Sequence, residues 1–224
     1  MNLLEAIQAR HSVRQYLDTP LTEAQIETLQ TAIREINEKS GLHIQLFTEE
    51  PDCFTGALAR YGNFSGVRNY LAMVGEKSDH LAETIGYYGE QLVLLAQQLG
   101  LNTCWVALTF SKRKCKAVIR KGEKMPIVIS LGYGATQGHD RKCKQPEEVA
   151  RYGDNAPAWY RNGIAAALRA PTAINQQKFY ITRDHNTVTI KATGGVHSDI
   201  DLGIVKYHFE IGAGTENFVW AEER

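Results

Sequence analysis

Apolar and polar positions alternate along the chain in a way that predicts helices followed by strands. Apolar residues spaced three and four apart indicate amphipathic helices. The clearest case has Leu29, Ile33 and Ile36 on one face, with a capping-box pattern of Thr22 and Gln25 at its start. Helices are expected over residues 2–10, 22–38, 79–100, 111–120, 157–170 and 199–212, and a short acidic helix is expected after Pro146.

Alternating or continuous apolar runs between these helices predict strands. Residues 126–133 read PIVISLGY, a nearly continuous apolar run that indicates a strand buried on both faces. Residues 42–48 alternate instead, which predicts a strand with one buried face. Further strands are expected at residues 69–75, 102–108, 179–182, 188–192 and 217–221.

The order of these elements suggests an internal duplication. Residues 22–48 read as helix, connector and strand, and residues 157–183 repeat that order. Residues 79–108 read as long helix and strand, and residues 199–221 echo them. The similarity lies in pattern and not in identity, so duplication is a hypothesis. It predicts one α+β domain over residues 1–224, with helices packed on a mixed sheet and two similar halves, 1–150 and 151–224.

The composition fits an ordinary globular chain and narrows its partners. Of 224 residues, 43% are hydrophobic and 22% charged, and the formal net charge is zero, which argues against bulk binding to nucleic acid or anionic membranes. No apolar run is long enough to span a bilayer, and the first residues lack signal-peptide features. The four cysteines form no C-x-x-C pair, so we expect neither a disulfide framework nor a metal site, and a cytoplasmic location.

Three polar segments are candidates for ligand binding. Residues 10–14, RHSVR, place two arginines and a serine where they could bind a phosphate, or they form a solvated basic turn. Residues 141–144 are a dense basic cluster in a neutral protein, with the same alternative. Residues 170–179, APTAINQQKF, are either a ligand-binding loop or a plain helix-to-strand connector.

Four motifs together give the chain a family resemblance. Residues 10–14 match an R-x-S-x-R/K element, and residues 171–179 are similar to a P-S-x-x-N-x-Q-P-W loop. Residues 100–106, GLNTCWV, match a G-L-x-T-C-W strand, and Leu131-Gly132-Tyr133 leads to a basic tail at residues 142–146. This combination resembles the FMN-dependent nitroreductase family, which implies a three-layer α/β/α fold with a mixed, mainly antiparallel sheet.

One departure from the family pattern supports the duplication. Family members carry the P-S-x-x-N loop after the first long helix, where this chain has NEKSG at residues 37–41. The motif lies in the second half, with Thr172, Lys178 and Phe179 in place of Ser, Pro and Trp. The chain therefore resembles a pseudo-dimeric branch, in which the second half replaces the partner subunit of a homodimer. A complete monomer is possible on this account, and a homodimer remains open.

The resemblance implies a set of flavin contacts. Arg10 and Ser12, with the two lysines of the basic cluster, would bind the phosphate and ribityl chain. Arg14 and Asn63 would reach the pyrimidine edge, the strand after residue 103 would offer backbone N–H groups near N5, and the loop would close over the flavin. The cofactor-binding residues expected are Arg10, His11, Ser12, Arg14, Asn63, Cys104, Trp105, Val106, Ala107, Lys142, Lys144, Pro171, Thr172 and Asn175.

The function implied is an FMN oxidoreductase with NADH or NADPH as electron donor. Because the flavin carries the redox chemistry, no catalytic side chain is expected. The acceptor would be a small molecule such as a nitroaromatic or a quinone. Two alternatives remain: a flavin-binding protein without NAD(P)H turnover, acting as sensor or store, and a protein of this fold without flavin. His197, Ser198 and Asp199 are read as helix-capping residues.

Overall fold

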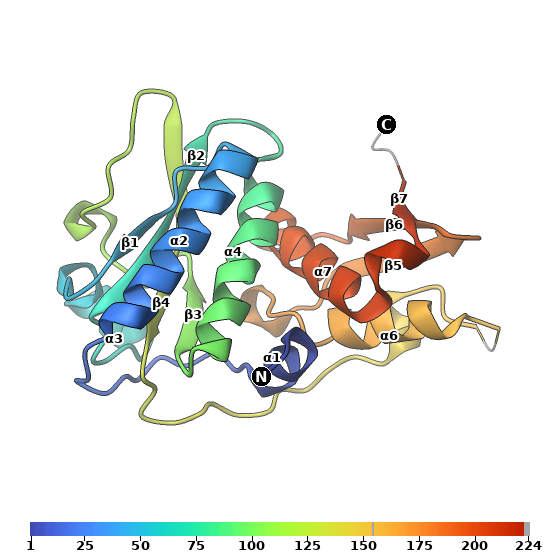
Figure 1. The fold of residues 1–224 in the computed structure, drawn as a ribbon, viewed down its shortest axis with the longest axis horizontal. Helices are drawn as coiled ribbons and strands as arrows, with labels where there is room; N and C mark the ends of the chain where they lie inside the picture. Colours follow the sequence, from blue (N-terminus) through green and yellow to red (C-terminus); the bar gives the residue numbers. More distant parts are fainter. Residues whose placement is uncertain (154, 222–224) are drawn as a thin grey trace. The chain divides into compact units, whose positions relative to one another are not determined.

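The computed structural model describes residues 1–153 and 155–221, which divide into two compact units (Figure 1). The four-stranded unit comprises Ala9–Leu81 and Leu92–Asp140. The three-stranded unit comprises Met1–Gln8, Ala82–Gln91 and the residues from Arg141 onward. The helix α4, Leu81–Gln98, is continuous in sequence and contributes residues to both units. Among the described residues, no helix combines the length and apolarity needed to cross a membrane.

The four-stranded unit is built on an antiparallel sheet in the order β1-β2-β4-β3. Its strands β2 and β4 are buried along almost their whole length, as the apolar run of residues 126–133 predicts. The edge strand β3 is also largely buried. The strands are β1, Gln45–Phe47; β2, Asn69–Glu76; β3, Asn102–Val106; and β4, Glu123–Gly132.

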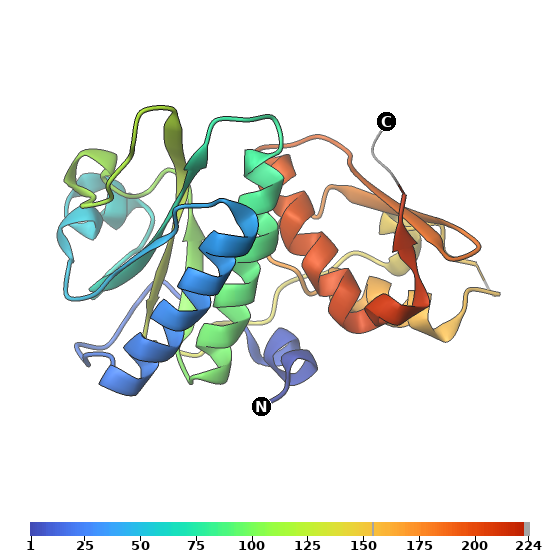
Figure 2. The same cartoon turned by 45° about the horizontal axis from the view of Figure 1, so that its top comes forward.

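The helix α2, Glu23–Ser40, begins and ends where local signals predict. Thr22 and Gln25 form the expected capping box, and Gly41 ends the helix at φ 71°, a left-handed conformation that glycine adopts without steric cost. Figures 1 and 2 show α2 across one face of the four-stranded sheet, beside the last turns of α4. The Gln25 side chain donates to the Leu99 carbonyl at 3.0 Å, which joins the two helices.

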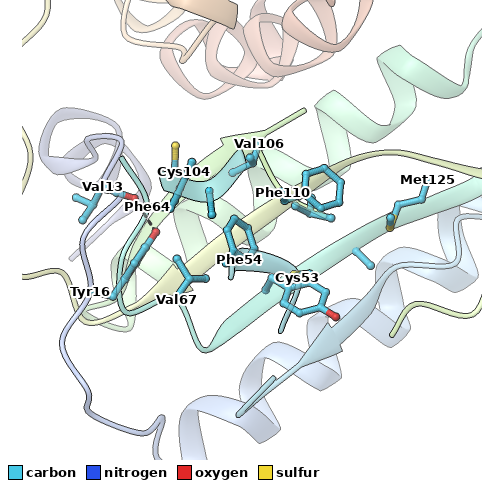
Figure 3. Packing of buried hydrophobic residues seen from close by; sticks show 14 of the residues in the cluster. Val13, Tyr16, Cys53, Phe54, Phe64, Val67, Cys104, Val106, Phe110 and Met125 are labelled. Carbon is cyan, nitrogen blue, oxygen red and sulfur yellow. Dashed lines mark hydrogen bonds between the residues drawn. The ribbon is translucent and has the colours of Figure 1, made fainter. Parts of the chain in front are cut away.

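An aromatic cluster covers one face of this sheet (Figure 3). Phe54 is at its centre, with ring centroids 5.3 Å from Phe64 and 6.2 Å from both Phe110 and Tyr70. One short α-helix and two 3-10 turns frame this cluster: η1, Asp52–Phe54; α3, Ala57–Tyr61; and η2, Lys112–Lys114. Burial of several large rings gives this unit its own hydrophobic core.

The three-stranded unit pairs β5 with β6 antiparallel and β6 with β7 parallel. The sheets of the two units are therefore mixed and mainly antiparallel, and the α+β class predicted from the sequence is confirmed. Figure 2 shows α7 against this second sheet. The elements are α1, Leu3–Ala9; α5, Pro146–Val149; α6, Ala158–Ala167; η3, Ala173–Asn175; β5, Phe179–Asp184; β6, Thr187–Ala192; α7, Ser198–Ala213; η4, Thr215–Asn217; and β7, Val219–Trp220.

Within the three-stranded unit, α4 and α7 meet at two glycines. A Cβ placed on Gly86 would lie 2.0 Å from the Ile200 carbonyl oxygen, and one on Gly203 would lie 2.0 Å from the Glu83 carbonyl oxygen. Only glycine allows the two backbones to approach this closely. The glycines therefore set the spacing of the two helices.

A fully buried pair of a glutamate and a histidine lies along the same two helices. The His208 ring nitrogen Nε2 is 2.8 Å from a carboxylate oxygen of Glu90, and neither side chain is exposed to solvent. The other ring nitrogen of His208 is 3.1 Å from the Ala166 carbonyl oxygen, which gives it a partner in α6. Both ring nitrogens are thus engaged, as a buried polar ring requires.

One predicted helix is wrong. Residues 111–120 form only the single 3-10 turn η2 and continue without regular secondary structure. The Tyr70 hydroxyl accepts from the Lys116 N–H at 3.1 Å, and Gln45 exchanges two hydrogen bonds with the Val118 backbone. These side-chain partners satisfy the backbone groups that a helix would have paired internally.

Smaller differences concern the ends and faces of elements. In α1 the buried residues are Ala6 and Ile7, whereas Leu4 is 51% exposed. The first and last strands are shorter than predicted, at residues 45–47 and 219–220. The helix-and-strand orders that suggested a duplication are present, but duplication itself and the three-layer arrangement stay predictions.

Candidate functional site

Residues 10–16, called the strap, lie along the edge of β3 in the four-stranded unit. Ser12 pairs with Thr103 of β3 in a parallel bridge, and Tyr16 pairs with Gly134. A Cβ on Gly66 would lie 2.2 Å from the Tyr16 carbonyl oxygen, so the strap is also packed tightly against this turn. Backbone bonds hold it on three sides: Val13 N to Thr103 O at 3.0 Å, Tyr16 N to Ser65 O at 3.0 Å, and Ala135 N to Gln15 O at 2.8 Å.

Three donor side chains of the strap gather around the Cys104 thiol. Burial raises the pKa of Cys104, while the charges of Arg14 and Arg10 and a hydrogen bond with Ser12 act to lower it. Arg10 is buried at 6% exposure, whereas Ser12 and Arg14 are exposed. The Arg14 guanidinium also lies 5.9 Å from the Phe64 ring centroid. The structure therefore brings together the donors that the sequence motif predicts.

His11 is engaged by the protein itself. Its Nδ1 lies 3.0 Å from the Ala9 carbonyl oxygen, and its Nε2 lies 3.3 Å from a carboxylate oxygen of Asp140. A Cβ on Gly138 would come within 2.5 Å of the His11 Cβ, so the chain after β4 packs directly on this residue. These contacts give His11 a bracing position in the strap.

The strand β3 offers its backbone to the strap and its alternate side chains to the core. Cys104 and Val106 are buried in the aromatic cluster (Figure 3), while Trp105 and Ala107 are partly exposed. Under the strap, the Ser130 hydroxyl lies 2.9 Å from the Tyr16 hydroxyl and donates to the Cys104 carbonyl at 3.4 Å. Any ligand contact from residues 104 and 106 must therefore come from the main chain.

Asn63 lies on a turn that contacts both the strap and the segment that follows β3. It is exposed and has φ 57°, a left-handed conformation that asparagine tolerates better than most residues. A Cβ on Gly62 would lie 2.6 Å from the Thr109 Cβ, and Ser65 bonds to the strap. Asn63 is thus held beside the same edge of the sheet as Arg14.

In the three-stranded unit, residues 170–179 form a loop bonded to the basic segment 141–145. The Asn175 amide donates to the Lys142 carbonyl at 2.9 Å, and the Lys144 ammonium donates to the Gln177 carbonyl at 2.8 Å. The Gln177 side chain accepts from the Lys144 N–H at 2.9 Å. Thr172 accepts from the Gln177 N–H at 3.0 Å. The unit therefore joins the predicted loop and the predicted basic cluster into one structure.

The loop has a strained backbone. Ile174, Asn175 and Gln177 all have positive φ, at 46°, 55° and 45°. Such values cost a β-branched residue like Ile174 about 1–3 kcal/mol and persist only where the surroundings impose them. Strain of this kind concentrates at ligand-binding segments, and Ile174 is also 87% exposed. Pro171, by contrast, is buried at the start of the loop.

Asp201 supports this loop through hydrogen bonds, a role that the sequence did not reveal. Its carboxylate accepts from the Ala173 N–H at 2.9 Å and from the Gln176 side chain at 2.7 Å. Burial raises the pKa of Asp201 to about 6, while these two bonds act to lower it. In the sequence it is an ordinary acidic residue in the first turn of a helix, so nothing marks its burial.

Comparison with known proteins identifies the family. A family described as "Putative TM nitroreductase" matches residues 2–213. The chain belongs to this nitroreductase family. The resemblance drawn from the four motifs is thereby confirmed. None of the curated proteins compared matches the chain.

Solved structures show the same nitroreductase fold. A nitroreductase-type protein from Thermotoga maritima has 23% identity and a TM-score of 0.69, covering 100% of this chain and 90% of its own. One from Desulfovibrio desulfuricans, solved in complex with FMN, has 16% identity and a TM-score of 0.54, covering 70% and 99%. One from Streptococcus pneumoniae has 15% identity and a TM-score of 0.53, covering 66% and 98%. At these identities the similarity establishes the fold.

Proposed function

We propose that this nitroreductase-family protein is an FMN-dependent oxidoreductase. It takes hydride from NADH or NADPH and delivers electrons to a small acceptor such as a nitroaromatic or a quinone. Membership of the family and the FMN in the similar Desulfovibrio desulfuricans structure support the proposal. Bound FMN would supply the hydride and electron chemistry, and the protein would bind it, orient it and exclude water.

The strap is the observation that carries the proposal. It presents two guanidinium groups and a hydroxyl within five residues, on a backbone held from three sides. Guanidinium groups bind phosphate through paired, charge-assisted hydrogen bonds, and a fixed backbone reduces the entropy lost on binding. This donor set fits FMN, which joins a phosphate to a polar chain and a flat aromatic ring. Arg10 and Ser12 would bind the phosphate and ribityl chain, and Arg14 the pyrimidine carbonyls.

The other proposed FMN contacts are supported either by their position beside the strap or by the sequence resemblance alone. Asn63 and the backbone of residues 104–107 lie beside the strap, where they could meet the same ligand. The contacts of Lys142, Lys144, Pro171, Thr172 and Asn175 are proposed from the sequence resemblance, since these residues belong to the other unit. The Lys144 ammonium has three N–H donors and donates one of them to the Gln177 carbonyl oxygen. The other two could bind a phosphate.

The FMN affinity of arginine variants tests the strap directly. We expect Arg14→Ala and Arg10→Lys each to raise the dissociation constant of FMN by about 10- to 100-fold, since a hydrogen bond to a charged group contributes about 1.5–3 kcal/mol. Arg10 is changed to lysine to keep a charge in its buried position. Fluorescence titration of FMN into the cofactor-free protein measures this.

Arg34→Ala is the matched control, because Arg34 is an exposed arginine of α2 in the same unit. It should bind FMN as the unchanged protein does. If the strap variants also bind FMN normally, the strap is not the phosphate site.

Anaerobic mixing of the FMN-bound protein with NADH or NADPH tests the reaction. Loss of the oxidised flavin's visible absorption, followed by its return when a quinone or nitroaromatic is added, is the expected result. A flavin that binds and is not reduced by either nucleotide would overturn the oxidoreductase proposal in favour of a flavin-binding protein without turnover.

A further inference from the structure

Two cysteines that are distant in sequence meet in the aromatic cluster of the four-stranded unit. Cys53 belongs to η1 and is 1% exposed, and Cys115 directly follows η2 and is partly buried against the same cluster. The Ser111 N–H donates to the Cys53 carbonyl at 2.7 Å, which fixes η1 against the chain that enters η2. Figure 3 shows Cys53 among the residues of this cluster.

The surroundings hold the Cys115 sulfur in one place. It lies 3.6 Å from the Tyr70 hydroxyl oxygen and 3.8 Å from the Met125 sulfur. The same Tyr70 hydroxyl accepts from the N–H of Lys116, so the backbone next to Cys115 is held as well. Each of the Cys53 and Cys115 thiols shifts the pKa of the other, so the two side chains are neighbours. Both cysteines are free.

We propose that Cys53 and Cys115 are a redox-active pair that forms a reversible disulfide when the protein meets a peroxide, with Cys115 as the sulfur that reacts first. The proposal assigns a modification site to η1 and to the segment after η2. It stands apart from the proposed flavin function, since neither cysteine belongs to the predicted cofactor set.

The chemistry proceeds in two balanced steps. The Cys115 thiolate attacks one oxygen of hydrogen peroxide, the O–O bond breaks, hydroxide leaves, and Cys115 becomes a sulfenic acid. The Cys53 sulfur then attacks the Cys115 sulfur, the S–O bond breaks, and water leaves with the Cys53 proton. The two thiols together lose two electrons to the peroxide. A dithiol such as dithiothreitol reverses the process by thiol–disulfide exchange.

The order of reaction follows from the two environments. The hydrogen bond from Cys53 lowers the pKa of Cys115, although burial opposes this, and Cys115 is also the more exposed of the two cysteines. The bond with Cys115 and then burial raise the pKa of Cys53. A partly exposed cysteine with a lowered pKa beside a buried thiol has the arrangement of an attacking and a resolving cysteine.

The other two cysteines lack this arrangement. Burial raises the pKa of Cys104, which keeps it a thiol under the strap. Cys143 is partly buried, like Cys115, but its sulfur is 3.6 Å from the Leu168 carbonyl oxygen and 3.8 Å from that of Arg141. Cys143 is therefore a matched control of similar exposure, bonded to carbonyl groups.

Peroxide treatment of the purified full chain, followed by alkylation and peptide mass mapping, tests the proposal. We expect loss of two hydrogens from the chain, a cross-linked peptide that contains Cys53 and Cys115, and restoration by dithiothreitol. Cys143→Ser should give the same result. Cys53→Ser should instead leave a sulfenic acid on Cys115 that reacts with dimedone.

A second measurement keeps the test decisive if a variant folds poorly. In the unchanged protein at pH 7, Cys115 should be alkylated about tenfold faster than Cys143, because the bond from Cys53 stabilises the Cys115 thiolate. Equal rates, a disulfide between another pair, or oxidation of Cys115 to sulfinic acid with Cys53 still reduced would each overturn the proposal. Because the readout is mass, these outcomes do not depend on whether the protein binds flavin.

Discussion

Asp201 shows how single residues of this protein are placed by partners distant in sequence. Its carboxylate holds the Ala173 backbone and the Gln176 side chain, so it braces the strained loop of residues 170–179. The strap residues Arg10, Ser12 and Arg14 could be found from sequence because their motif is local. Asp201 and the cysteine pair could not, because burial and long-range contact leave no local pattern.

The raised pKa of Asp201 predicts a dependence of stability on pH. The folded carboxyl, with a pKa of about 6, holds its proton more tightly than the unfolded one, whose ordinary value is 3.8. The free energy of unfolding should therefore fall between about pH 4 and pH 6, by at most about 3 kcal/mol from this group. Asp201→Asn cannot titrate and should lack this fall.

Urea denaturation across this pH range measures the effect as a difference between the two proteins, since other groups titrate equally in both. Asp199→Asn is the matched control, because Asp199 is exposed in the same turn of α7 and should retain the fall. Parallel curves for Asp201→Asn and the unchanged protein would show that this carboxyl does not carry the dependence.

At the scale of elements, local signals predicted α2 well because its capping box, apolar stripe and final glycine all lie within its own sequence. The segment 111–120 was predicted wrongly because its conformation depends on Tyr70 and Gln45, which belong to other strands. The strands β1 and β7, which lie at the edges of their sheets, are both shorter than predicted.

The close contact of α4 and α7 predicts that Gly203→Ala is strongly destabilising. The added methyl group would lie 2.0 Å from the Glu83 carbonyl oxygen and would force the helices apart. We expect a loss of about 1–3 kcal/mol or more in the free energy of unfolding, measured by urea denaturation. Gly153→Ala is the control, since among the described residues no atom outside its chain neighbours lies within 4 Å of the added methyl, and it should be close to neutral.

The buried pair of Glu90 and His208 predicts a non-additive pair of substitutions. Glu90→Leu leaves the histidine buried without its carboxylate and should cost about 3–5 kcal/mol. Adding His208→Leu removes the remaining polar ring, so the double variant should regain part of that loss. Thermal and urea unfolding of the two single variants and the double variant measure the coupling. Additive losses would mean that the two side chains do not stabilise each other.

At the scale of the whole molecule, the family could be predicted from sequence because four motifs are spread along most of the chain, and the α+β class could be predicted from the order of helices and strands. The fold persists at 23% identity over the full length of the chain. The acceptor could not be predicted, because loops shape the substrate pocket of such a fold and a shared fold does not fix a substrate.

The duplication hypothesis predicts that the protein binds flavin as a monomer. If the second half of the chain replaces a partner subunit, a single 25.0 kDa chain should bind one flavin. Light scattering of the flavin-bound protein distinguishes this monomer from a dimer of twice that mass. Flavin bound only by the dimer would contradict the pseudo-dimeric account.

The central claim, that this protein binds FMN, is tested most directly by the visible absorption spectrum of the purified protein, with the chromophore released and identified. The account predicts a yellow protein that releases FMN, or a colourless one that takes up added FMN in a ratio of about one per chain. A colourless protein that takes up no FMN would contradict it and leave only the nitroreductase fold.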